Sequence, residues 1–73
     1  MDRALAKQHL AEAERDVALG QTHIERQFQI IAELERDGHD ATRARELLAT
    51  FMAVQVEHKT HRDQLLRELD GPE

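Results

Sequence analysis

The amino-acid sequence predicts an all-α protein: a long antiparallel helical hairpin, coiled-coil-like, that pairs with a second copy into a four-helix bundle. Apolar residues recur every seven positions through both halves of the chain, and a short segment containing Gly38 separates the halves. The period-two alternation of β-strands is absent, and one Pro among 73 residues argues against a β-rich or disordered chain. We expect a single domain over residues 1–73.

The first helix is expected over about residues 2–37. Large apolar residues recur here every seven positions: Leu10, Val17, Ile24 and Ile31. A second row has the same period: Ala6, Ala13, Gly20, Gln27 and Leu34. An alternative is a break at Gly20, because Thr22 followed by Glu25 is a capping-box pattern. The seven-residue phase passes through Gly20 without slipping, which favours one continuous helix.

Residues 38–40 are expected to form the turn between the helices. Gly38 suits the left-handed backbone just past a helix end, and Asp40 suits the N-cap of the next helix. So short a connection makes the two helices antiparallel.

The second helix is expected over about residues 41–69, with a frayed tail over 70–73 that begins at the Gly71-Pro72 pair. Its central row repeats every seven residues: Ala44, Phe51, His58 and Leu65. With the bend centred on His39, four pairs are expected to face each other: Ile31 with Leu47, Ile24 with Val54, Gly20 with His58, and Ala13 with Leu65. Small residues would then oppose large ones, which favours close packing.

Two helices that bury one stripe each leave part of each stripe uncovered, so we expect a two-fold symmetric homodimer. A larger assembly or an unidentified protein partner is the alternative. The expected self-association interface comprises Leu10, Val17, Ile24, Phe28, Ile31, Leu47, Leu48, Phe51, Val54 and Leu65. Apolar residues outside these rows are candidates for a partner surface: Leu5, Leu19, Ile30, Met52, Val56 and Leu66.

Polar residues interrupt the predicted contact rows far from the turn. An alternative function is therefore a metal-binding or sensing bundle, since bundle metal sites take His and carboxylates from facing helices. Its ligands would be Asp16, His23, His58 and His61. The sequence has neither paired Glu-x-x-His motifs nor a His-Glu-x-x-His motif. A polar layer of seam histidines that fixes register is favoured, and no metal or other cofactor is expected.

Composition and charge exclude several other function classes. The net charge of −5 and the interleaved charges oppose nucleic-acid binding, which needs a basic surface. No apolar run is long enough to span a membrane, and the start resembles no secretory signal, so a cytoplasmic protein is expected. The chain has no Cys or Ser, and a two-helix hairpin offers little concave volume, so no enzyme activity is expected.

Four segments together carry a family resemblance: residues 9–15, 34–40, 44–51 and 61–66. They resemble short helical-hairpin proteins of alphaproteobacteria, a family with no assigned activity. The resemblance covers nearly the whole chain. It implies a bacterial, cytoplasmic setting and adds no catalytic residue.

Overall fold

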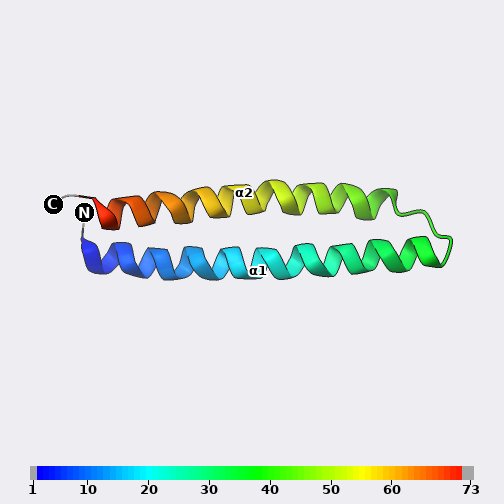
Figure 1. Ribbon diagram of the computed structural model, residues 1–73, viewed down its shortest axis with the longest axis horizontal. Coiled ribbons are helices and arrows are strands. Elements are labelled where there is room, and N and C mark those ends of the chain that lie inside the picture. Colours follow the sequence, from blue (N-terminus) through cyan, green and yellow to red (C-terminus); the bar gives the residue numbers. More distant parts are fainter. Residues whose placement is uncertain (1, 72–73) are drawn as a thin grey trace.

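The computed structural model describes residues 2–71 and shows two long helices joined into a hairpin (Figure 1). Helix α1 spans Arg3–Arg36 and helix α2 spans Thr42–Asp70. They run antiparallel and side by side, so residues 2 and 71 lie at the same end of a rod measuring 58 × 14 × 13 Å. The described residues contain no strand, and the predicted all-helical hairpin is confirmed.

Helix α1 is continuous through its single internal glycine. The carboxylate of Asp2 caps its start by accepting a hydrogen bond from the Ala4 backbone N–H at 2.9 Å. Thr22 does not cap a second helix, because its hydroxyl donates to the Ala18 carbonyl one turn earlier, at 3.2 Å. The alternative break at Gly20 is therefore wrong.

The turn ends α1 with a left-handed glycine, as the sequence predicted. Gly38 has φ 74° and follows the C-cap residue Asp37. The Gly38 N–H donates to the Glu35 carbonyl and the His39 N–H donates to the Leu34 carbonyl, at 3.1 and 2.8 Å. These two bonds form a Schellman motif, which satisfies carbonyls that the helix end would leave unpaired.

Asp40 lies one residue before the N-cap of α2, and not at the N-cap itself as predicted. Ala41 occupies the N-cap position, and the Asp40 carboxylate accepts from the Thr42 N–H at 2.9 Å and the Thr42 hydroxyl at 2.7 Å. The bond from the Thr42 hydroxyl has the largest effect on the Asp40 carboxyl. Together with the bond from the Thr42 N–H and the positive charge of Arg45, it keeps the pKa of Asp40 below its ordinary 3.8. Arg45 also forms a 2.7 Å ion pair with Glu35, which links the two helices beside the turn.

The predicted register between the helices is wrong by about one turn. Gln55, not His58, packs against Gly20. Leu47 and Val54, expected opposite α1, are exposed, whereas the next residues, Leu48 and Gln55, are half-buried and buried. The cause is the connection 37–41, which runs back along α1 before α2 begins (Figure 1).

The hairpin core is narrow, and helix α2 ends at Asp70, one residue past the predicted limit of the second helix. Gly71 follows it, while residues 72 and 73 of the predicted tail lie outside the described part of the chain. The buried apolar residues are Ala6, Ala13, Ile24, Ile31, Ala41 and Leu65. Half of them are alanines, so the two helices approach closely and leave their larger apolar side chains partly uncovered.

Candidate interaction site

A buried glutamine and a glycine meet at the middle of the hairpin. Gln55 is only 4% exposed, and its Nε2 donates to the Val17 carbonyl of α1 at 2.8 Å. Its side chain fills the space where a Cβ of residue 20 would lie, so a larger residue at that position would displace the Gln55 amide. The Gly20 Cα hydrogen on that side points at Gln55 Oε1, which has no hydrogen-bond donor within the described residues.

Gln27 makes the reciprocal contact from α1 to α2. Its Nε2 donates to the Ala44 carbonyl at 2.8 Å, and the residue is buried. Each helix therefore donates one side-chain amide hydrogen bond to a backbone carbonyl of the other helix. Sliding either helix along its partner by one turn would break both bonds. The register-fixing polar layer consists of Gln27 and Gln55, and not of histidines as predicted. The signal available in the sequence was spacing: Gln27 stands seven residues after Gly20, and Gln55 stands seven residues after Leu48.

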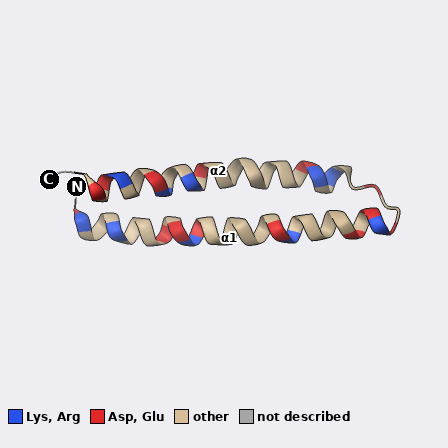
Figure 2. Cartoon of the chain, in the orientation of Figure 1, with Lys and Arg blue, Asp and Glu red and all other residues tan. Residues whose placement is uncertain are grey.

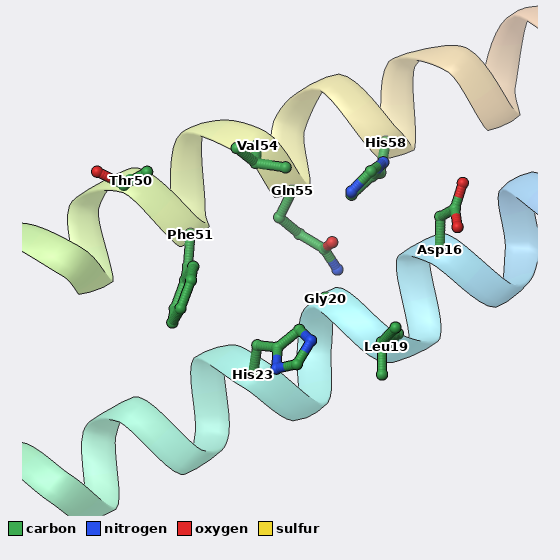
Figure 3. A pocket seen from close by; sticks show the side chains of 9 residues that line it. All are labelled: Asp16, Leu19, Gly20, His23, Thr50, Phe51, Val54, Gln55 and His58. Atoms are coloured by element: carbon green, nitrogen blue, oxygen red, sulfur yellow. The ribbon is translucent and has the colours of Figure 1, made fainter.

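A groove beside this crossing, here called the histidine groove, has a volume of about 310 Å³ (Figure 3). Its walls come from both helices: Asp16, Leu19, Gly20, His23, Thr50, Phe51, Val54, Gln55 and His58. The His23 ring of α1 lies beside the Phe51 ring of α2, with centroids 5.8 Å apart and planes inclined at 33°. Asp16 and His58 lie toward the opposite end of the groove from that ring pair. The lining is thus mainly apolar, with imidazole and carboxylate groups at its edges.

The four candidate metal ligands are only partly brought together. Asp16, His23 and His58 line the histidine groove, whereas His61 is exposed and does not line it. Over residues 2–71, no group of three or more His, Asp or Glu side chains has the geometry to hold a metal ion.

A second groove, here called the opposite groove, lies on the other face of the hairpin and has a volume of about 330 Å³. Its lining residues are Gln21, Ile24, Met52, Gln55, Val56 and Lys59. Val54 and Val56 flank Gln55 in the sequence and line different grooves, as expected for opposite sides of one helix. Both faces of the middle of the rod are therefore apolar and hollowed.

The predicted interface residues divide into three groups in this structure. Ile24, Ile31 and Leu65 are buried within the hairpin itself. Four others are half-buried: Leu10, Val17, Leu48 and Phe51. Phe28, Leu47 and Val54 are exposed. Among the residues predicted for a partner surface, Ile30 is half-buried, and the exposed ones are Leu5, Leu19, Met52, Val56 and Leu66.

Charged residues avoid the middle of the rod (Figure 2). Residues 47–56 of α2 and 17–24 of α1 contain no Asp, Glu, Lys or Arg. Neither helix of the described chain has the length and apolar character needed to cross a membrane. The chain matches no protein-family model, no curated protein and no solved structure.

Proposed function

We propose that this protein is a protein–protein interaction module whose working form is a self-associated hairpin, with two copies forming a four-helix bundle. The supporting observation is the set of large apolar side chains that one hairpin leaves exposed. They are Leu5, Leu19, Phe28, Leu47, Met52, Val54, Val56 and Leu66. Scattered apolar residues are normal on a protein surface, but five of these eight lie in the uncharged segments 17–24 and 47–56.

The surface area of the hairpin supports the same proposal. Its accessible surface is 5551 Å². A compact monomer of 8.4 kDa is expected to expose about 4,600 Å². The excess is comparable to the roughly 800 Å² that each partner buries in a stable protein–protein interface. Pairing along the rod would cover an area of this size and complete the burial of Phe51 and Leu48.

Sedimentation equilibrium of the purified chain at about 10 μM tests the proposal, since a micromolar dissociation constant corresponds to about −8 kcal/mol. We expect twice the chain mass of 8.4 kDa. A helical species that keeps the single-chain mass at this concentration, and at tenfold higher concentration, would contradict the proposal.

A further inference from the structure

We propose that the second copy covers the histidine groove with the turns of both hairpins at the same end, and that this pairing takes up protons on histidines beside the groove. This inference rests on the proposed self-association and specifies its surface, its orientation and its dependence on pH. It is carried by the register of the hairpin and by the placement of its histidines and carboxylates.

Contacts within the hairpin fix which residues of α1 and α2 lie at the same level along the rod. Gly20 packs against Gln55, and the His23 ring lies beside the Phe51 ring. Residues whose numbers add up to about 75 therefore share a level. A two-fold axis parallel to the rod leaves every level unchanged and places α1 over the partner's α2. This pairing therefore has no adjustable position along the rod.

Rows of side chains extend the groove lining along the rod, because residues seven positions apart share a row. The side of the rod formed by these rows, together with Phe51 and His58, is here called the histidine face. Its inner rows, next to the hairpin core, are His9, Asp16, His23 and Ile30 of α1 and Leu47, Val54, His61 and Glu68 of α2. Its outer rows are Leu5, Glu12, Leu19, Arg26 and Glu33 of α1 and Arg43, Thr50, Glu57 and Gln64 of α2.

Toward the open end of the rod, the inner rows bring histidines of one copy to carboxylates of the other. His9 lies level with the partner's Glu68, and Asp16 lies level with the partner's His61, each to within about 3 Å along the rod. All four side chains are exposed in one hairpin, and within residues 2–71 none of them forms an ion pair. Each pair occurs twice by symmetry, so the dimer gains four facing imidazole–carboxylate pairs.

Toward the turn, the inner rows are apolar. Ile30 lies level with the partner's Leu47, and His23 lies level with the partner's Val54. These side chains would bury one another together with Phe51, which one hairpin leaves half-buried. The turn half of the histidine face therefore supplies the apolar contact of the interface.

The outer rows add one opposite-charge pair, because Glu33 lies level with the partner's Arg43. Their other level pairs join unlike groups: Glu12 with the partner's Gln64, Leu19 with the partner's Glu57, and Arg26 with the partner's Thr50. No level pair in the inner or outer rows opposes like charges, which favours this orientation.

Histidines are the only cationic side chains in the open-end half of the histidine face. Over residues 5–19 of α1 and 57–69 of α2, its rows contain no Lys or Arg. They hold four carboxylates: Glu12, Asp16, Glu57 and Glu68. The histidines of this half are His9, His58 and His61. Two copies would bring these carboxylates together, so protonated histidines are needed to offset the repulsion.

The charged groups that face His61 are acidic on both helices and in both copies. Glu57 stands four residues before it on α2, and Asp16 lies at its level on its own α1 and on the partner's α1. Arg62 follows it in the sequence but forms an ion pair with Asp63 at 3.0 Å. Facing carboxylates favour the protonated imidazole, more strongly once a second copy excludes water.

His9 has the same kind of surroundings. Glu12 stands three residues after it on α1, and Glu68 lies at its level on its own α2 and on the partner's α2. The partner's His9 and His61 lie diagonally across the bundle from their counterparts, farther away than the facing carboxylates. Because histidine changes charge between about pH 5 and 8, the dimer should bind more tightly as pH falls through this range.

The opposite orientation joins like charges near its centre. With the turns at opposite ends, a two-fold axis crossing the rod at the level of Gln55 pairs Arg26 with the partner's Glu12. The same axis sets Glu57 about 6 Å along the rod from the partner's Glu57, which disfavours association. It also brings His9 to an apolar part of the partner's α1, where burial opposes the charged imidazole. That dimer would weaken as pH falls.

Sedimentation equilibrium of the full chain at pH ~6 and pH ~8.5 tests the proton uptake. Each proton taken up on association changes the dissociation constant about tenfold per pH unit. We expect the dimer dissociation constant to be at least about tenfold lower at pH ~6 than at pH ~8.5. Equal constants at the two pH values, or a lower one at pH ~8.5, would overturn the proposal.

Replacing the two facing histidines should remove this dependence. In H9Q/H61Q, the constants at the two pH values should differ by less than about threefold. His39→Gln is the matched control, because His39 lies in the turn, outside the histidine face, and it should keep the wild-type ratio to within about twofold. Equal loss of pH dependence in H9Q/H61Q and H39Q would contradict the assigned histidine–carboxylate pairs.

Single cysteines report the orientation, because the chain contains no Cys of its own. In an equal mixture of Glu33→Cys and Arg43→Cys chains, a short bis-maleimide should join one chain of each kind, since the two positions share a level near the turns. Glu33→Cys alone is the control and should give little product, because α1 lies diagonally opposite the partner's α1. A mixture that gives no more product than this control would overturn the orientation.

Paired acidic substitutions test which face is covered. Leu19 and Val54 of the histidine groove are 57% and 41% exposed, and Met52 and Val56 of the opposite groove are 48% and 63% exposed. L19E/V54E should raise the dimer dissociation constant more than about 100-fold, whereas M52E/V56E should change it less than about threefold. Circular dichroism checks that both variants remain helical.

The outcomes separate the two proposals. A wild-type dimer that M52E/V56E dissociates and L19E/V54E does not would show that the wrong face was assigned, while self-association stands. A wild-type chain that stays monomeric at both pH values would contradict the proposed function itself, and this inference with it.

Discussion

At the scale of single residues, the close contact between Gly20 and Gln55 determines how a substitution at residue 20 should change stability. In an exposed helix, Gly→Ala gains about 1 kcal/mol of stability. Here the new methyl group would occupy the space of the Gln55 amide and displace it from the Val17 carbonyl. Losing that buried hydrogen bond costs about 1–3 kcal/mol. We therefore expect Gly20→Ala to lower the free energy of unfolding, measured by urea denaturation.

The sign of this effect should reverse when Gln55 is shortened. In a Gln55→Ala background the space beside residue 20 is empty, so adding Gly20→Ala should stabilise the helix by about 1 kcal/mol. The same destabilisation by Gly20→Ala in both backgrounds would mean that the glutamine does not set the requirement for glycine.

At the scale of the elements, the turn and the start of α2 predict how stability depends on pH. The pKa of Asp40 is lowered in the folded chain by its hydrogen bonds to Thr42 and by Arg45. A carboxylate whose pKa is lower in the folded chain than in the unfolded chain stabilises the fold at pH values above the unfolded pKa. That stabilisation is lost as pH falls through the folded pKa. The free energy of unfolding of wild type should therefore exceed that of Asp40→Asn at pH ~5. The difference should shrink as the pH falls below 3.8, the ordinary pKa of this carboxyl.

Urea unfolding of the two proteins at several pH values measures that difference directly. Other carboxylates titrate in both proteins and cancel in the subtraction. A gap between wild type and Asp40→Asn that stays constant from pH ~5 to ~2.5 would contradict the assigned role of Asp40.

The two helices and their turn followed from sequence patterns because their causes are local. Seven-residue rows predict amphipathic helices, and Gly38 supplies the left-handed residue that ends α1. The pairing between helices did not follow, because it depends on the path of residues 37–41, which no periodicity determines. With the register shifted, the buried polar positions fell on Gln27 and Gln55, whereas His58 stayed half-buried at the groove edge.

At the scale of the whole molecule, Phe51 reports whether self-association buries side chains that one hairpin leaves partly exposed. In one hairpin it is half-buried beside His23. If the dimer completes its burial, Phe51→Ala should cost about 3–5 kcal/mol per chain and dissociate or unfold the protein. The exposed neighbour Met52, on the other face, is the control, and Met52→Ala should change stability by about 0.5 kcal/mol or less.

Chemical denaturation followed by circular dichroism at several protein concentrations measures both effects. The wild-type midpoint should rise with concentration, as mass action requires for a folded dimer. Similar small losses for Phe51→Ala and Met52→Ala would indicate that Phe51 remains half-exposed in solution.

Because the hairpin folds back on itself, residues 2 and 71 lie at one end of the rod and the turn lies at the other. At 1.5 Å per residue, the 34 residues of α1 hold the turn about 50 Å from the open end. The hairpin therefore has the geometry of a rigid spacer, with its open end and its turn held apart by a distance that helix length alone sets.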